Sequence, residues 1–291
     1  MEFAELQPDL QQWIRDAVKA GQQPSVMVEA LLRAGYQPSI SRAVKQCIAD
    51  FGGSGDPDCR LPRAQADSGQ RFRLFEPQTN NIPVDTQRVE VLLSLRSPNL
   101  ILFGNLLSAS ECNALIELSR PQLKPSRVVN SDNGAFDLGE ARTSYGACFQ
   151  RAECPLIAAI ENRIARLLGV SARRGEPLQI LHYERGAQYR PHYDFFSPER
   201  AGHREVLSHG GQRVGTLIMY LNDVVAGGAT VFPKLALEIL PKKGCGLFFS
   251  YANERGELDY QTLHGGSPVG EGEKWIATKW LRQADYVTEE D

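Results

Sequence analysis

The chain has 291 residues, 42% hydrophobic and 23% charged, which is enough to bury a core and too apolar for a wholly disordered protein. A formal net charge of −3 argues against a nucleic-acid-binding protein, because such proteins neutralise phosphates with basic surfaces. No apolar run approaches the roughly 20 residues of a membrane span, and the acidic first residues do not resemble a secretory signal. We therefore expect a cytoplasmic protein without a nucleic-acid or membrane partner.

The N-terminal part, residues 1–51, predicts a small helical module. Apolar residues recur at helical spacing in three runs, and Gly21 and Gly35 separate these runs. The module contains no histidine and no acidic cluster, so we expect a packing unit or a docking site for a protein partner. Residues 52–85 begin with a stretch rich in Gly, Pro, Ser and Asp and stay polar, which predicts a linker with a blurred end.

Residues 86–291 predict a mainly β domain with flanking helices. Strand patterns occur at 89–93 and 100–103, a capping box at Ser108–Glu111 begins a helix that ends at Pro121, and a second helix is expected over 155–168. Further short strands are expected at 178–184, 188–194, 213–221, 229–232, 236–240, 245–250, 262–264 and 273–281. Many short strands after two helices favour a β-sandwich or barrel.

Three residues could form a metal site. His192 and Asp194 are two positions apart in a predicted strand, so their side chains lie on the same face. One imidazole and one carboxylate are two members of the 2-His-1-carboxylate site that holds non-haem Fe(II) with open positions. A His-x-Asp pair is common without a metal, so the hypothesis needs a third ligand, and His264 can supply it.

Lys274 indicates what the open positions of such a metal would bind. A 2-oxo acid fills two positions by chelation and dioxygen takes the third, which leaves the remote carboxylate of the acid in need of a cation. Lys274 follows His264 by ten residues and can be that cation. In a strand from Lys274 to Trp280, the residues Lys274, Ile276, Thr278 and Trp280 share one face.

Residues 98–283 resemble the catalytic domain of prolyl 4-hydroxylases, the collagen-type and plant/algal branch of the Fe(II)/2-oxoglutarate dioxygenases. The resemblance lies in LQILHYERGAQYRPHYD (178–194), GQRVGTLIMYLND (211–223), GGATVFP (227–233), PKKG (241–244), residues 264–280, and Arg142-Thr143-Ser144. It implies a double-stranded β-helix, or jelly roll, as the catalytic core, in addition to the N-terminal helical module.

The resemblance also implies roles for residues of this chain. His192, Asp194 and His264 would bind Fe(II), with no catalytic side chain beyond this metal centre. The residues that it implies for 2-oxoglutarate are Lys274, Tyr183, Thr278 and Trp280. The residues that it implies for the peptide-proline site are Arg142, Ser144, Glu176, Tyr189 and Arg213. Residues 195–212 fall where the family has a loop that closes over the substrate.

The function that we expect is hydroxylation of a prolyl residue in a peptide or protein, coupled to decarboxylation of 2-oxoglutarate to succinate and CO2. Fe(II) and 2-oxoglutarate are the implied cofactor and cosubstrate, and L-ascorbate is the implied reductant. The same machinery could instead act on a free amino acid, a lysyl residue or a small metabolite. An inactive jelly roll that serves only as a binding protein is a further alternative.

Overall fold

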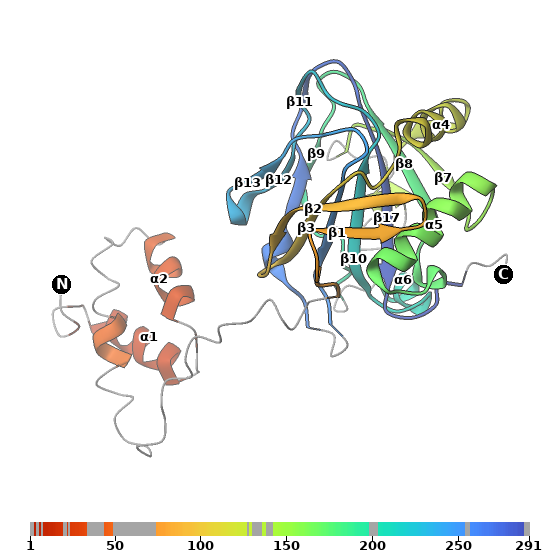
Figure 1. Cartoon of the computed structure of the whole chain (residues 1–291). Coiled ribbons are helices and arrows are strands. Elements are labelled where there is room, and N and C mark those ends of the chain that lie inside the picture. Colours follow the sequence, from red (N-terminus) through yellow and green to blue (C-terminus); the bar gives the residue numbers. More distant parts are fainter. Residues whose placement is uncertain are drawn as a thin grey trace. The chain divides into compact units, whose positions relative to one another are not determined.

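The computed structural model of the chain divides into two compact units, Met1–Ala66 and Asp67–Asp291 (Figure 1). The described residues are 3, 6, 8–19, 22, 24–33, 44–48, 74–126, 128–129, 136–137, 142–197, 203–253 and 257–287. In the first unit, α1 (Pro8–Lys19) and α2 (Pro24–Arg33) are helices, and residues 44–48 are also helical. Ile14, Met27 and Val44 are fully buried in a small core of their own.

A nine-stranded antiparallel sheet is the frame of the second unit. Its strands, in spatial order, are β1 (Asn81–Val84), β2 (Gln87–Leu95), β3 (Asn99–Gly104), β14 (Gly246–Ser250), β10 (Arg213–Tyr220), β17 (Lys274–Arg282), β8 (Leu178–Tyr183), β7 (Tyr145–Phe149) and β4 (Lys124–Pro125). The central strands β14 and β10 are almost entirely buried, as expected for strands covered on both faces.

A four-stranded sheet lies opposite the central strands of the first sheet. Its order is β13 (Leu237–Ile239), β12 (Thr230–Phe232), β15 (His264–Gly266) and β9 (Tyr189–His192). Two further pairs are β11 (Ala226–Gly227) with β16 (Val269–Glu271), and β5 (Val128–Val129) with β6 (Phe136–Asp137). The two facing sheets confirm the expected double-stranded β-helix.

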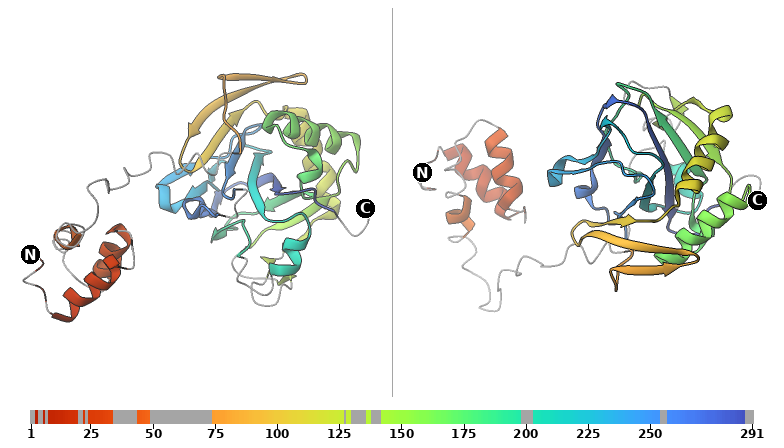
Figure 2. Two further views of the ribbon diagram at one scale, coloured as in Figure 1. Left: turned by 90° about the horizontal axis from the view of Figure 1, so that it is seen from below. Right: turned by 45° about the horizontal axis from the view of Figure 1, so that its top comes forward.

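Helices α4 (Ala109–Ser119) and α5 (Pro155–Leu168) lie on one side of the nine-stranded sheet, and β9, β12 and β13 lie on the other (Figures 1 and 2). The predicted capping box begins α4: the Glu111 amide donates to Ser108 Oγ at 3.2 Å, and the Ser108 amide donates to Glu111 Oε2 at 2.8 Å. The remaining helical segments are α6 (Arg204–Ser208) and the 3-10 turns η3 (Arg120–Gln122), η4 (Ala172–Arg174), η6 (Pro233–Leu235) and η7 (Tyr260–Thr262).

The structure contains strands that the sequence did not predict, such as β7 and β16, and it also differs from three of the predicted segments. Residues 81–84, assigned to the linker, form edge strand β1, where Pro83 is tolerated because an edge strand leaves backbone amides unpaired. The strand expected over 262–264 is displaced, because the Asp259 side chain accepts a hydrogen bond from the Gln261 amide and forms η7, after which β15 begins at His264. The strand expected over 188–194 ends at His192.

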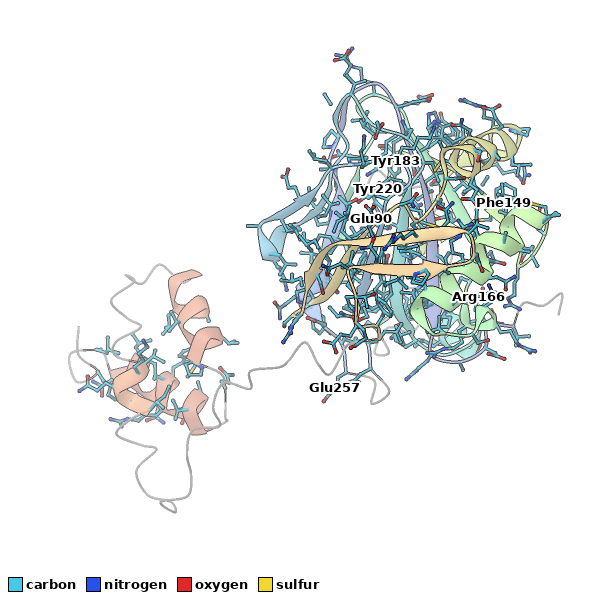
Figure 3. The ribbon with its side chains drawn as sticks, in the orientation of Figure 1. Glu90, Phe149, Arg166, Tyr183, Tyr220 and Glu257 are labelled. Carbon is cyan, nitrogen blue, oxygen red and sulfur yellow. The ribbon has the colours of Figure 1, made fainter. Side chains whose placement is uncertain are left out.

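Figure 3 shows Tyr183 and Tyr220 inside the second unit, whereas Glu257 projects from its surface. No helix in the described part of the chain is long and apolar enough to cross a membrane. Residues 198–202 of the predicted loop over the substrate lie outside the described residues.

Candidate metal centre and its pocket

His192, Asp194 and His264 lie together between the two sheets. His192 ends β9 and His264 begins β15, and the two residues are partners in the antiparallel register of these strands. Nε2 of His192 is 3.4 Å from Asp194 Oδ1, and Nε2 of His264 is 3.5 Å from Asp194 Oδ2. The candidate ligand atoms of the three residues all lie within 4.8 Å of one another, so one metal ion could contact all three.

The backbone holds both imidazoles with Nε2 toward the shared carboxylate. His192 Nδ1 lies 3.0 Å from the Arg190 carbonyl oxygen, and His264 Nδ1 lies 3.0 Å from the Thr262 carbonyl oxygen. Burial lowers the pKa of His264 to about 4, so its imidazole is neutral at pH 7. Burial opposes ionisation of Asp194, but His264 and His192 lower the pKa of its carboxyl well below the usual range. Two imidazoles and one carboxylate fit a non-haem iron site.

A hydrogen-bonded pair behind Asp194 was not predicted from the sequence. The Thr216 hydroxyl donates to Asp194 Oδ2 at 2.6 Å, and its oxygen lies 2.9 Å from the Tyr251 hydroxyl. Both side chains are fully buried. The sequence signal for this pair was a threonine between apolar residues in a strand pattern, since β10 reads Arg-Val-Gly-Thr-Leu-Ile-Met-Tyr.

Lys274 is a buried cation in the same pocket as the metal triad. It begins β17 directly opposite Tyr183 of β8, and its Nζ lies 5.5 Å from the centre of the Tyr183 ring. Among the described residues no carboxylate forms an ion pair with it, and burial lowers the pKa of its ammonium group to about 8. An unpaired buried ammonium group is costly, so the pocket favours an anionic ligand.

The other residues predicted to contact 2-oxoglutarate also line this pocket. Tyr183, Thr278 and Trp280 are lining residues of the pocket that also contains Lys274 and the triad. Thr230 lines it as well and was missed by sequence reasoning; its oxygen accepts a hydrogen bond from the Tyr220 hydroxyl at 2.8 Å, which leaves the Thr230 hydroxyl free to donate to a ligand.

Two of the five residues predicted for the substrate site, Arg142 and Tyr189, line the pocket. The Tyr189 ring stacks on His192 with ring centres 3.7 Å apart, and the Arg142 guanidinium lies 4.9 Å from the centre of the Tyr189 ring. Ser144 lies behind Arg142 and accepts a hydrogen bond from its Nε at 3.2 Å.

Glu176 and Arg213 are not among the residues that line the pocket; they form an ion pair behind it, in which Glu176 is buried and Arg213 is partly buried. Nε and Nη2 of Arg213 donate to the Glu176 carboxylate, at 2.6 and 2.7 Å, and Arg282 Nε approaches the same carboxylate at 2.6 Å. The Arg213 guanidinium lies 4.0 Å from the centre of the Trp280 ring, and its Nη1 donates to the Asp194 carbonyl at 3.3 Å. The pair therefore supports Trp280 and the segment that carries Asp194.

Comparison with known proteins identifies the class to which this fold and site belong. The model of the 2OG-Fe(II) oxygenase superfamily matches residues 178–282, which include the triad and Lys274. A solved viral collagen prolyl hydroxylase from Paramecium Bursaria Chlorella virus-1, in complex with 2OG, is 29% identical with a TM-score of 0.50, over 63% of this chain and 95% of that one. The protein is thus a 2-oxoglutarate-dependent dioxygenase.

Plant relatives narrow the assignment. "Probable prolyl 4-hydroxylase 3" of Arabidopsis thaliana is 38% identical over 208 residues, which is 65% of this chain and 71% of that protein. Prolyl 4-hydroxylase 1 of the same plant is 39% identical over 202 residues, 64% of this chain and 70% of that protein. The chain belongs to the prolyl 4-hydroxylase family of the 2OG-Fe(II) oxygenase superfamily.

Proposed function

We propose that the protein hydroxylates a prolyl residue of a peptide or protein, with Fe(II) as cofactor and 2-oxoglutarate as cosubstrate. The observation that carries the proposal is Lys274, a buried ammonium group without a carboxylate partner among the described residues, in one pocket with two histidines and an aspartate. That combination suits a dianionic 2-oxo acid, whose remote carboxylate is neutralised by Lys274.

His192, Asp194 and His264 would hold Fe(II), and Lys274, Tyr183, Thr278 and Trp280 would hold 2-oxoglutarate. When bound, these groups supply the oxidation chemistry: 2-oxoglutarate and O2 give succinate and CO2, and the second oxygen atom is inserted into a C–H bond of the substrate. The chain itself orients and shields the site. The Phe249 ring lies 4.6 Å from the His264 ring, in contact with an imidazole that is already held by the backbone.

A prolyl substrate is supported by the names of the relatives and by the rings at the pocket. Tyr189 and Trp280 offer flat apolar surfaces for a pyrrolidine ring. We propose that Arg142 and Tyr189 contact the peptide, whereas Ser144, Glu176 and Arg213 hold the contacting residues in place. An ascorbate requirement, a cytoplasmic location, and a protein partner for the N-terminal helices are further predictions from the sequence.

The test is mass spectrometry of proline-containing peptides incubated with the full chain, Fe(II), 2-oxoglutarate and ascorbate. We expect a gain of one oxygen atom that fragmentation places on proline, with one succinate formed per hydroxylation. His264→Ala should abolish both products and also lower the amount of bound Fe(II). Oxidation of a free amino acid or a lysyl peptide, with every proline peptide unchanged, would contradict the prolyl assignment but keep the dioxygenase class.

A further inference from the structure

Five cationic side chains of the described residues are buried in the second unit: Arg142, Arg163, Lys274, Lys279 and Arg282. Three have a carboxylate partner: Arg163 pairs with Glu111, Lys279 with Glu161, and Arg282 with Glu176. Arg142 and Lys274 have no ion-pair partner within the described part of the chain. These two are also the cations that line the pocket of the metal triad.

Among the described residues, the groups that contact the Arg142 guanidinium are neutral. Its Nε donates to Ser144 Oγ at 3.2 Å, its Nη2 donates to Gln179 Oε1 at 2.9 Å, and its guanidinium stands over the Tyr189 ring. A guanidinium has five N–H groups, so three remain without an acceptor among the described residues. A buried charge satisfied only by neutral acceptors is costly, and an anion in the pocket would remove this cost.

The charge balance of the pocket leaves Arg142 uncompensated, an argument that rests on the proposed function. The pocket-lining charges are Asp194, Lys274 and Arg142. A divalent metal ion, the Asp194 carboxylate, a dianionic cosubstrate and the Lys274 ammonium sum to zero. The positive charge of Arg142 then has to be balanced by the molecule that enters last, which is the substrate.

We propose that Arg142 binds a carboxylate of the substrate and so makes the enzyme select prolines that lie beside a negative charge. The carboxylate belongs to an acidic side chain next to the target proline or to the C-terminus of the substrate itself. The planar guanidinium fork matches a carboxylate with two parallel hydrogen bonds, which a lysine cannot reproduce.

Arg142 is positioned to contact the substrate residue next to the proline that reacts. Tyr189 contacts both Arg142 and the candidate metal ligand His192. Its ring centre lies 3.7 Å from the centre of that imidazole. The guanidinium is therefore one aromatic ring removed from the metal centre. A carboxylate on the neighbouring residue of a peptide can span that separation, because the length of its side chain adds to the roughly 3.8 Å between consecutive Cα atoms.

The experiment compares matched substrates with the full chain. The peptides carry either Glu or Gln beside the target proline, and each is made with a free and with an amidated C-terminus. Free proline and proline amide complete the series. We expect kcat/KM to be about tenfold to hundredfold higher for the carboxylate form than for its neutral twin, the range of a charge-assisted hydrogen bond. The Glu/Gln pair and the acid/amide pairs distinguish a side-chain carboxylate from a C-terminal one.

Variants of Arg142 test whether this residue causes the preference for a carboxylate. Arg142→Gln should abolish the preference with little change in KM for 2-oxoglutarate, and Arg142→Lys should restore only part of it. Arg185→Gln, which removes an exposed arginine beyond the end of β8, is the control for net charge and should keep the full preference. A thermal melt and far-UV circular dichroism verify that each variant is folded.

Equal kcat/KM values for the charged and the neutral substrate of each pair, measured with the wild-type protein, would overturn the inference. Neutral backbone acceptors of the substrate would then satisfy Arg142. A preference that persists in Arg142→Gln would overturn it as well. If no member of the series is oxidised while 2-oxoglutarate is still consumed, the proposed function fails. In that case, fluorescence anisotropy measures the affinity for labelled forms of the charged and neutral substrates. This measurement tests the carboxylate preference without relying on turnover.

Discussion

At the scale of a single residue, Lys274 would link the affinity for 2-oxoglutarate to pH under the proposed function. Burial lowers the pKa of its ammonium group from 10.5 to about 8, so the folded chain favours the neutral amine. Below pH 8 the buried charge costs about 3 kcal/mol of folding free energy, because one pKa unit corresponds to about 1.4 kcal/mol. Between pH 8 and 10.5 the unfolded chain binds the extra proton, so this cost falls as the pH rises.

We therefore expect kcat/KM for 2-oxoglutarate to fall above pH 8 as the free enzyme loses the Lys274 proton. Lys274→Met should lower cosubstrate affinity about tenfold to hundredfold, remove that pH dependence, and increase the free energy of unfolding at pH 7. Urea unfolding and steady-state kinetics between pH 6.5 and 9.5 measure both effects. An unchanged affinity in Lys274→Met would mean that another cation binds the remote carboxylate.

Under the proposed function, Thr216 and Tyr251 would act on the metal through Asp194. Because Thr216 donates to Oδ2 and contacts the Tyr251 hydroxyl, the carboxylate has one oriented oxygen before any metal binds. Groups behind metal ligands typically contribute 10-fold to 100-fold in metal affinity or activity.

We expect Thr216→Val to weaken Fe(II) binding by about that factor and Tyr251→Phe to weaken it less, since Tyr251 acts through Thr216. Metal titration measured by tryptophan fluorescence gives the two dissociation constants. Tyr260→Phe, at an exposed residue whose ring is separated from the Tyr251 ring by Phe195, is the control. Equal metal affinity in Thr216→Val and the unchanged chain would contradict the role.

At the scale of the element, strand β17 carries functional side chains on one face and structural side chains on the other. Lys274, Thr278 and Trp280 line the pocket, whereas Lys279 points to the other face and forms a buried ion pair with Glu161 of α5. Gly175 lies against the Lys279 side chain, and a Cβ there would collide with Lys279 Cε. The pair thus fixes the helix layer against the strand that carries the pocket.

We expect Glu161→Gln to destabilise the fold by about 3–5 kcal/mol, because it leaves the Lys279 ammonium buried without a counter-charge. The double variant Glu161→Leu with Lys279→Met should recover most of this loss. Urea unfolding measures the free energy of unfolding of each variant. The control is Glu117→Gln in the exposed Arg120–Glu117 pair, for which we expect a change below about 1 kcal/mol. A double variant as unstable as the single one would show that packing, and not charge, dominates at this position.

The sequence was most informative where side chains repeat with the period of the element. The alternation of β17 predicted which residues share the pocket face, and the Ser108–Glu111 capping box predicted the start of α4. Asp194 lies beyond the end of β9, so its approach to His192 comes from the chain path after the strand and not from strand alternation. The pairing of Arg213 with Glu176 depends on contacts 37 residues apart, which no local pattern encodes.

At the scale of the whole molecule, the second unit begins before the expected boundary at residue 86. The Leu74 amide donates to Ser250 Oγ at 3.4 Å, Asn99 donates to the Phe75 carbonyl at 3.2 Å, and β1 pairs with β2. Val84 is buried in the core of this unit. Segments 74–84 therefore contribute to the sheet that carries the pocket.

We expect a chain that starts at Asp67 to keep the melting temperature of the second unit and its 2-oxoglutarate turnover. A chain that starts at residue 86 should melt several degrees lower, because it lacks β1 and the Phe75 contact with Phe103. Calorimetry of the two truncated chains beside the full chain is the measurement. Identical melting of the two truncated chains would show that the linker does extend to residue 85.

Lys274 belongs to the nine-stranded sheet, whereas His192 and His264 are paired within the four-stranded sheet. Under the proposed function, one small molecule held by both the metal and Lys274 is a removable crosslink between the two layers. Linkage then requires Fe(II) to strengthen cosubstrate binding by the same factor by which the cosubstrate strengthens Fe(II) binding. The two sheets should accordingly separate most slowly when both ligands are present, and release of succinate would loosen the barrel once in every turnover.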